Sequence, residues 1–116
     1  MKEITPAYIR DQISKGKKYI IVFKKIGPRR GQTEEEANEI HQAHLMHLFT
    51  LKEQGIILLN GPVLDHPEIK GISIFNSSDK NEVPELANQD PAAIAGRLVN
   101  EAYEWFGIPE KNVIWE

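Results

Sequence analysis

The sequence contains no cysteine among its 116 residues. That absence excludes a disulfide framework, a thiolate nucleophile and any metal site that uses cysteine ligands. An excess of basic residues is also missing, because 14 Lys and Arg are outnumbered by 17 Asp and Glu, which gives a formal net charge of −3. Proteins that bind nucleic acid through its phosphates need a basic surface, so we expect no nucleic-acid partner.

Long hydrophobic runs are the third absence. No stretch is apolar over the roughly 20 residues that a membrane helix needs, and the first residues carry no apolar signal-peptide run. We therefore expect a cytoplasmic protein that does not associate with a membrane. The length suits one globular domain, and the content of 41% hydrophobic and 27% charged residues is close to the globular average.

One long helix, expected over residues 34–54, is the strongest pattern in the chain. Thr33 and Glu36 have the spacing of a capping box at its start, and Gly55 is a typical stop at its end. Residues three, four and seven positions apart share one face of a helix. The apolar members of one such stripe are Ala37, Ile40, Leu48 and Leu51.

His44 lies at the centre of this apolar stripe, with His41 and His47 on its two shoulders. An imidazole in an apolar seam is a local conflict, and such conflicts are typical of functional or strained positions. His44 could act as a general acid or base, since an unperturbed pKa of about 6.5 allows proton exchange at neutral pH. The alternative is a core histidine whose ring nitrogens are satisfied by backbone groups.

The three helix histidines also invite a metal interpretation, because imidazole is a common ligand. Their spacing spreads them over about 120° of the helix surface, so they do not easily converge on one ion. The sequence also lacks an HExxH motif and a Glu-x-x-His pair. We therefore expect no metal and no other cofactor, and we interpret His41 and His47 as residues at the edges of the stripe or as walls of a cleft.

Arg29 and Arg30 lie in a polar loop before the long helix. Guanidinium groups bind carboxylates in a bidentate manner, so this pair could attract an anionic substrate. The alternative is that both are solvated loop charges. The glycines of the loop do not form a phosphate-binding motif, because the GxxxxGK[ST] pattern is absent.

The remaining sequence predicts a short N-terminal helix and several strands. Thr5 can cap that helix, with Pro6 in its first turn. Residues 97–106 fit helix spacing and strand alternation about equally. The other expected elements are strands over residues 18–26, 56–64, 69–76 and 113–116, a short helix over residues 83–89, and a cap or turn at Asp90-Pro91.

The order β-α-β-β-α-β points to a ferredoxin-like α+β fold, in which helices cover one face of an antiparallel sheet. The other face would be exposed and apolar in a monomer, which predicts a homodimer. We expect residues 1–17 to form an N-terminal helical extension and residues 18–116 to form the ferredoxin-like domain.

A set of residues spread between positions 18 and 106 occurs in a recognisable order. It comprises His44-Leu45, Leu48, Leu51 and Gly55 in the long helix, Gly61-Pro62 at the end of the next strand, Asp65, Gly71, Asp90-Pro91 and Gly96. In these residues and their spacing the chain resembles the YCII-related proteins, a family of small dimeric α/β-barrel domains.

This resemblance implies a ferredoxin-like subunit whose sheet joins a second sheet across a dimer, and it implies a strand for residues 97–106. It also implies a cleft in which a His and an Asp form the catalytic pair. His44 is the matching histidine, and either Asp90 or Asp65 could be its partner, although an aspartate in a cap or turn is the plainer alternative for both. One relative is a dehydrochlorinase of chlorinated hydroxyquinones, and muconolactone isomerases are more distantly similar.

We therefore expect a cofactor-independent enzyme in which His44 moves a proton on a small cyclic molecule that is anionic or phenolic. Elimination, isomerisation and lactone chemistry would all fit one positioned acid–base pair. A non-enzymatic ligand-binding or regulatory dimer and a structural dimer with a buried histidine are the alternatives. The expected substrate-binding residues are His41, His47, Arg29, Arg30, Gly61 and Pro62.

Overall fold

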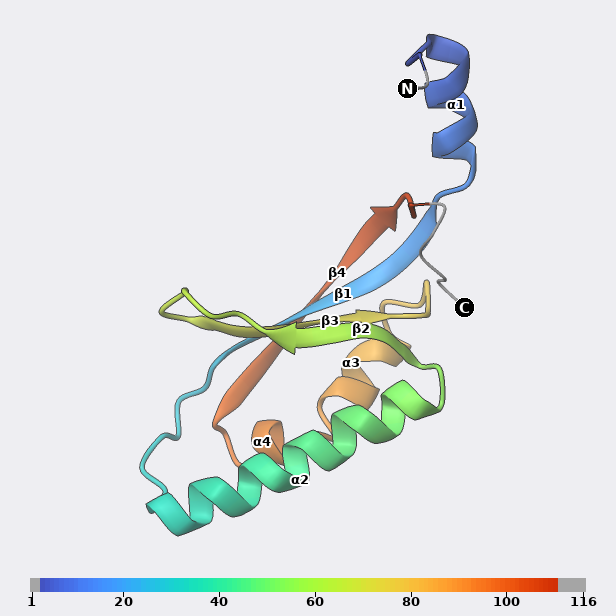
Figure 1. Cartoon of the computed structure of the whole chain (residues 1–116). Helices are drawn as coiled ribbons and strands as arrows, with labels where there is room; N and C mark the ends of the chain where they lie inside the picture. The colour runs from blue at the N-terminus through green and yellow to red at the C-terminus, as the bar shows by residue number, and fades with distance from the viewer. Residues whose placement is uncertain (1–2, 111–116) are drawn as a thin grey trace.

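The computed structural model describes residues 3–110, which form four helices and four strands (Figure 1). In chain order the elements are α1 (Pro6–Ser14), β1 (Lys17–Ile26), α2 (Glu34–Glu53), β2 (Ile57–Pro62), β3 (Ile69–Phe75), α3 (Glu82–Ala87), α4 (Pro91–Ile94) and β4 (Leu98–Gly107). After α1 they follow the expected β-α-β-β-α-β order, with the second helical segment divided into α3 and α4. The strand expected over residues 113–116 lies outside the described residues.

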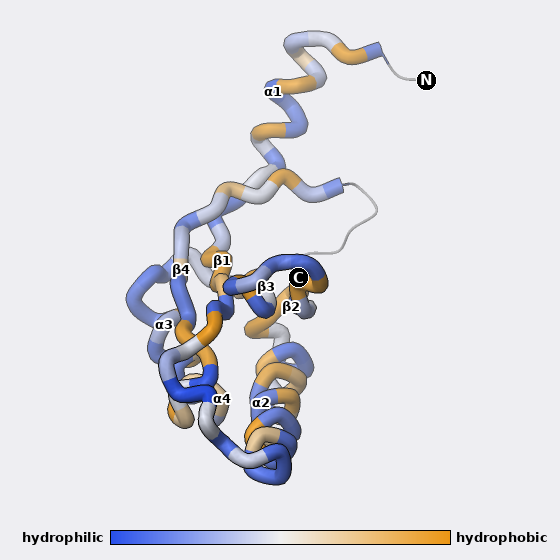
Figure 2. The backbone as a smooth tube through the Cα atoms, turned by 90° about the vertical axis from the view of Figure 1, so that its left-hand side faces the viewer, coloured by the Kyte–Doolittle hydropathy of each residue, from blue (hydrophilic) through white to orange (hydrophobic). Residues whose placement is uncertain are grey.

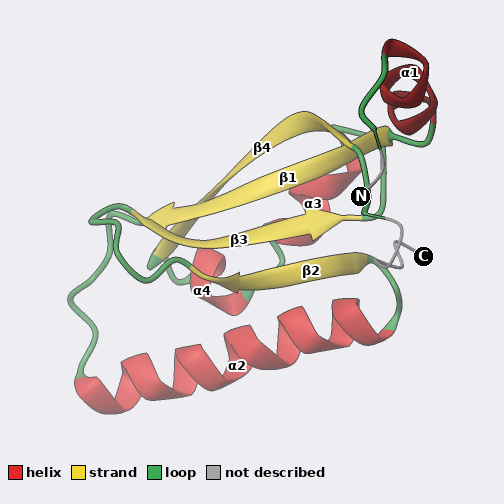
Figure 3. Cartoon of the chain, turned by 45° about the horizontal axis from the view of Figure 1, so that its top comes forward, coloured by secondary structure: helices red, strands yellow, loops and turns green. Residues whose placement is uncertain are grey.

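The four strands form one antiparallel sheet in the order β2-β3-β1-β4. Helices α2, α3 and α4 lie against the same face of this sheet (Figure 3). This is the ferredoxin-like α+β fold that the sequence predicts. Residues 97–106, which were ambiguous by pattern, contribute the edge strand β4, and β4 pairs with β1 along the whole length of both strands.

The hydrophobic core lies between the helices and the sheet. Ile20 and Val22 of β1 point toward the helices and are fully buried, as alternation along a strand requires. They belong to the same core cluster as Leu48 and Leu51, which come from the apolar stripe of α2. A fully buried aliphatic side chain contributes about 1.5–3 kcal/mol, so the stripe holds α2 on the sheet.

The opposite face of the sheet is only partly covered by the chain itself. Ile21 and Phe23 of β1 are half-buried on this side, whereas Ile20 and Val22 on the helix-facing side are fully buried. This open face is apolar, as the sequence predicts for a single subunit. Its exposed hydrophobic side chains are Leu59, Val99, Tyr103 and Trp105.

Helix α2 begins and ends as its sequence predicts. The Thr33 hydroxyl accepts a hydrogen bond from the Glu36 amide at 3.1 Å, and the Glu36 carboxylate accepts one from the Thr33 amide at 2.9 Å, which completes the capping box. After the helix, Gly55 adopts a φ of +76°, a left-handed conformation that favours glycine and ends the helix.

Helix α1 stands away from the sheet, beyond the start of β1 (Figures 1 and 2). Thr5 caps it as predicted, because its hydroxyl accepts a hydrogen bond from the Tyr8 amide at 3.1 Å. No residue of α1 is buried, and Ile9 and Ile13 are about half exposed. No helix among residues 3–110 is long and apolar enough to cross a membrane.

Candidate active site

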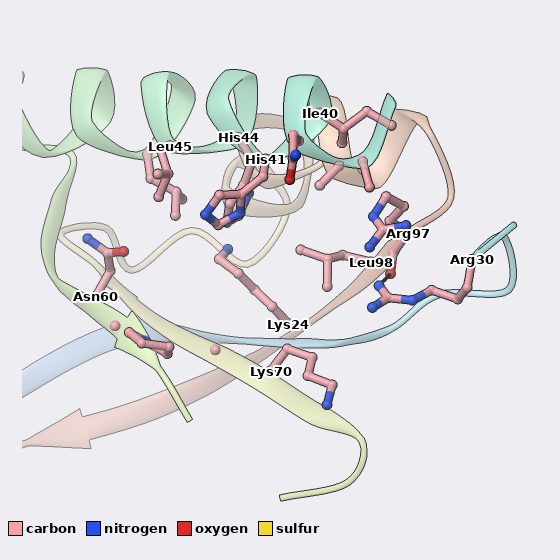
Figure 4. A pocket seen from close by; sticks show the side chains of 17 residues that line it. Lys24, Arg30, Ile40, His41, His44, Leu45, Asn60, Lys70, Arg97 and Leu98 are labelled. Atoms are coloured by element: carbon pink, nitrogen blue, oxygen red, sulfur yellow. Dashed lines mark hydrogen bonds between the residues drawn. The ribbon is translucent and has the colours of Figure 1, made fainter. Parts of the chain in front are cut away.

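A pocket of about 560 Å³ lies between α2 and the helix-facing side of the sheet (Figure 4). Its volume is in the range that accommodates a small ligand. Apolar side chains of α2 and the backbone at Gly61 and Pro62 form part of its walls. The basic side chains that line it are Lys24, Arg30, His41, His44, Lys70 and Arg97, and no Asp or Glu among residues 3–110 lines it directly.

His44 and Asp90 form a direct pair at this pocket. The Nδ1 atom of His44 lies 2.6 Å from the Oδ2 atom of Asp90, a distance typical of a charge-assisted hydrogen bond. Because an ionised carboxylate can only accept, the Nδ1 atom carries the hydrogen in this pair. The Nε2 atom of the same ring is then left to accept a proton.

The local sequence around Asp90 explains why its carboxylate is held so firmly. Asp90 caps α4, and its Oδ1 atom accepts a hydrogen bond from the Ala92 amide at 2.9 Å, while Pro91 occupies the first helical turn. The Oδ1 atom therefore caps the start of α4, and the Oδ2 atom orients His44. The Asp-Pro pair was predicted to be a cap or a turn, and it is a cap.

The electrostatics of Asp90 favour its ionised form. Complete burial of the residue acts to raise its pKa, but hydrogen bonds from His44 and from the Ala92 amide act in the other direction. The positive charges of His44 and Lys24 add to that effect. The net result is a pKa of Asp90 below its ordinary value, so the carboxylate is charged at neutral pH.

Lys24 is the least exposed of the basic groups that line the pocket. The residue is only 4% exposed, and no hydrogen bond or ion pair joins its Nζ atom to any group among residues 3–110. Burial lowers the pKa of Lys24, and the charge of Asp90 offsets part of that effect. Lys24 is thus a buried amine that faces the pocket.

Arg30 and Arg97 come together at another side of the pocket. The Nη1 atom of Arg30 donates to the Arg97 carbonyl oxygen at 2.7 Å, and the Nη1 atom of Arg97 donates to the Oε1 atom of Gln32 at 2.7 Å. Neither guanidinium forms a salt bridge with a carboxylate in the described part of the chain. Partial burial and the charge of Arg97 both lower the pKa of Arg30.

Most of the residues proposed from the sequence line this pocket. His41, His44, Arg30, Gly61 and Pro62 are all part of its wall. Asp90 lies directly behind His44. These residues come from four separate segments of the chain, and the fold brings them to one place.

Three of the proposed residues lie elsewhere. Arg29 is exposed outside the pocket, and its side chain packs over Gly96. Asp65 is exposed in the loop between β2 and β3, so the structure pairs His44 with Asp90 instead. His47 is half-buried and does not line the pocket, and burial lowers its pKa.

Sequence reasoning missed Lys24, Arg97 and Asn60 as lining residues. Lys24 did carry a signal, because it continues the inward-pointing series of Ile20 and Val22 and a charge in such a series is out of place. Arg97 and Asn60 carried no such signal. Arg97 directly precedes β4 and Asn60 lies in β2, and their places in the pocket depend on how these strands pack against α2. Leu45 also lines the pocket.

Metal ligands do not gather in the described part of the chain. No group of three or more His, Asp or Glu side chains lies close enough together there to hold an ion. His41 and His44 are neighbours, with ring centroids 6.1 Å apart, but His47 lies on the other shoulder of the stripe.

The fold and the pocket define a class of protein. It is a small α+β protein with a ferredoxin-like subunit fold, in which a pocket with a His–Asp pair lies between the sheet and its long helix. The sequence model of the YCII-related domain matches residues 19–105. The chain therefore belongs to the YCII-related family, as its residues predicted.

A solved structure supports the same fold. The chain is similar to a 5-chloro-2-hydroxyhydroquinone dehydrochlorinase from Burkholderia phenoliruptrix AC1100, determined in complex with 2,5-dihydroxybenzoquinone, with a TM-score of 0.57 and 22% sequence identity. The match covers 75% of this chain and 92% of that chain. At this identity the similarity shows the fold. No curated protein matches the sequence.

Proposed function

We propose that this protein is a cofactor-independent acid–base enzyme that acts on a small cyclic, anionic molecule. The observation that carries the proposal is the 2.6 Å hydrogen bond between His44 Nδ1 and Asp90 Oδ2 at the wall of a pocket. A carboxylate that holds one ring nitrogen fixes the tautomer of the imidazole and stabilises its protonated form. The basic lining of the pocket supports an anionic ligand.

The proposed chemistry needs only one proton carrier. The Nε2 atom of His44 takes a proton from an acidic O–H or C–H bond of the ligand, and the electron pair of that bond moves into the ring system. In an isomerisation, the imidazolium returns the proton to a different carbon. In an elimination, a leaving group departs with its bonding electron pair, and the imidazolium releases its proton to solvent. Asp90 stabilises the imidazolium in either case.

The similar dehydrochlorinase supports elimination from a hydroxylated ring as the first reaction to test. Its name gives a small cyclic substrate, and its bound ligand is also a small ring. A ligand of that size suits a pocket of about 560 Å³. The direct assay is therefore chloride release from 5-chloro-2-hydroxyhydroquinone, with His44→Asn as the inactive control.

The proposal also includes a homodimer formed through the open face of the sheet. Phe23, Ile72 and Tyr103 give this face an apolar centre, and Phe23 and Tyr103 form an edge-to-face pair with ring centroids 5.7 Å apart. Contiguous apolar surface of this kind is typical of a subunit interface, and an isologous pairing would bury it in both copies.

NMR of the His44 ring nitrogens tests the acid–base proposal without knowledge of the substrate. We expect the neutral ring to carry its proton on Nδ1 in the wild-type protein and to lose this preference in Asp90→Asn, because the carboxylate that accepts from Nδ1 is gone. Asp65→Asn is the matched control and should leave the tautomer of His44 unchanged. A His44 ring that carries its proton on Nε2 in the wild-type protein would contradict the enzyme and leave a binding or structural role.

A further inference from the structure

Lys24 is a buried charge that the His44–Asp90 chemistry does not use. Its side chain lines the pocket, and its ammonium group has no hydrogen-bond acceptor among residues 3–110. The stem of Lys24 is buried, and its ammonium group reaches the pocket. A negatively charged group of a ligand would supply the missing acceptor.

The backbone aims Lys24 into the pocket. Lys24 follows Val22 on the helix-facing side of β1, and its partner on β3 is Gly71. A Cβ atom at Gly71 would lie 3.6 Å from Cδ of Lys24, an ordinary van der Waals distance, so the lysine stem runs alongside Gly71. Figure 4 shows the amine directed toward α2, where His41 and His44 are carried.

Arg30 and Arg97 form a second positive centre in the same pocket. Figure 4 shows both guanidinium groups to one side of Lys24. Gln32 and the Arg97 carbonyl hold them in place through the two 2.7 Å hydrogen bonds, so the two like charges are fixed near each other. In the part of the chain that the structure describes, no acidic side chain lines the pocket to neutralise them.

We propose that the ligand of this pocket is a small diacid, with one anionic oxygen held by Lys24 beside His44 and a second anionic group held by Arg30 and Arg97. The inference rests on the proposed function and specifies its substrate class. Hydroxyquinones with two ionised oxygens and aromatic dicarboxylates both have this chemistry.

Lys24 then has a part in the reaction. When Nε2 of His44 removes a proton, the electron pair of the broken bond gathers on a ligand oxygen. An ammonium already fixed beside that oxygen stabilises the developing charge without reorganising, which is the action of an oxyanion site. The step consumes no oxidant or reductant, because only a proton and an electron pair move.

The test measures equilibrium binding of three probes by calorimetry at pH 7.5. Two are dianions, 2,5-dihydroxybenzoquinone and phthalate, and one is a monoanion, benzoate. We expect the wild-type protein to bind at least one dianion at least tenfold more tightly than benzoate. Lys24→Met should weaken dianion binding by about ten- to a hundredfold, because a charge-assisted hydrogen bond is lost. Lys24→Arg, which keeps the charge, should retain more of the binding than Lys24→Met.

Two matched controls separate the pocket from general charge. Arg30→Gln should weaken dianion binding, whereas Arg29→Gln, in the same loop but outside the pocket, should not. Lys52→Met removes an exposed lysine from α2 and should also have no effect. Dianions that bind no better than benzoate would overturn the inference, and so would unchanged dianion binding in Lys24→Met.

The failure of this inference can be distinguished from the failure of the proposed function. His44→Asn should abolish turnover and keep dianion binding. Dianion binding that depends on Lys24, in a protein without turnover and without the ring proton on Nδ1 of His44, would contradict the enzyme and keep the diacid site. Turnover that depends on His44, together with dianion binding that Lys24→Met leaves unchanged, would contradict the diacid site and keep the enzyme.

Discussion

A Cβ atom added to Gly27 would overlap the carbonyl oxygen of Gly96, so the two glycines bring their backbones into direct contact. Around this contact, the Gly27 amide donates to the Arg97 carbonyl at 2.8 Å and the Arg29 amide donates to the Gly96 carbonyl at 2.9 Å. Gly96 itself has a φ of +78°, which turns the chain from α4 into β4. The contact therefore holds the segments that carry Arg30 and Arg97 together.

Gly27→Ala should separate these two segments. We expect a loss of about 1–3 kcal/mol in the free energy of unfolding, because the methyl group has no space. Anion binding should weaken as the two arginines move apart. Gly31→Ala is the matched control, since a Cβ atom there meets nothing within 4 Å. Urea unfolding and calorimetry measure the two effects, and equal results for both variants would contradict the argument.

The fold could be predicted from the sequence because its signals are local. The capping box at Thr33, the glycine stop at Gly55 and the run of aromatic and β-branched residues in β1 each predict one element, and the element order then predicts the topology. Residues 97–106 were the exception. Their helix and strand propensities are about equal. They form a strand because they pair with β1, which lies far away in the sequence.

The candidate site was predicted only in part, because several of its residues lie in short connecting segments. The positions of those segments depend on how helices and strands pack. His44 was found from a single helix, in which spacing alone shows the conflict between imidazole and apolar stripe. The sequence could not choose between Asp90 and Asp65, because each follows a plausible turn and only the docking of α4 against α2 brings one of them to His44. Arg97 was missed for the same reason.

Acid should remove the stability that Asp90 contributes. Its pKa in the folded protein lies below the ordinary 3.8, so the contribution is fully present above that pH and is lost as the pH falls through the folded value. We expect Asp90→Asn to be less stable than wild type by about 1–3 kcal/mol at pH 7. The difference should shrink below about pH 4.

Urea unfolding at pH 7, 5 and 3 measures this difference. Asp65→Asn serves as the control, because Asp65 is exposed and the same charge change there should leave stability nearly unchanged at each pH. A constant difference between wild type and Asp90→Asn over this pH range would show that Asp90 acts as a helix cap alone.

Lys24→Met should stabilise the fold while it removes ligand binding. Burial outweighs the attraction of Asp90 in setting the pKa of Lys24, so the charged amine costs folding free energy at neutral pH. We expect an increase of about 1–3 kcal/mol in the free energy of unfolding, which thermal or urea unfolding can measure. The gain should diminish as the pH approaches the ordinary lysine value of 10.5, where the amine is increasingly neutral in both states. A less stable Lys24→Met would show that Asp90 needs this charge.

Phe23→Glu should convert the proposed homodimer into a monomer. Phe23 packs edge-to-face on Tyr103 at the centre of the open face, and a carboxylate there would have to be buried against its own copy across an isologous interface. Light scattering after gel filtration should give twice the mass of the chain for the wild-type protein and the mass of one chain for the variant. Phe49→Glu makes the same change at an exposed position of α2 and should remain dimeric.

If both variants keep the wild-type mass, subunits do not pair through the open face. If Phe23→Glu alone dissociates and still binds the dianions, the pocket is complete within one subunit.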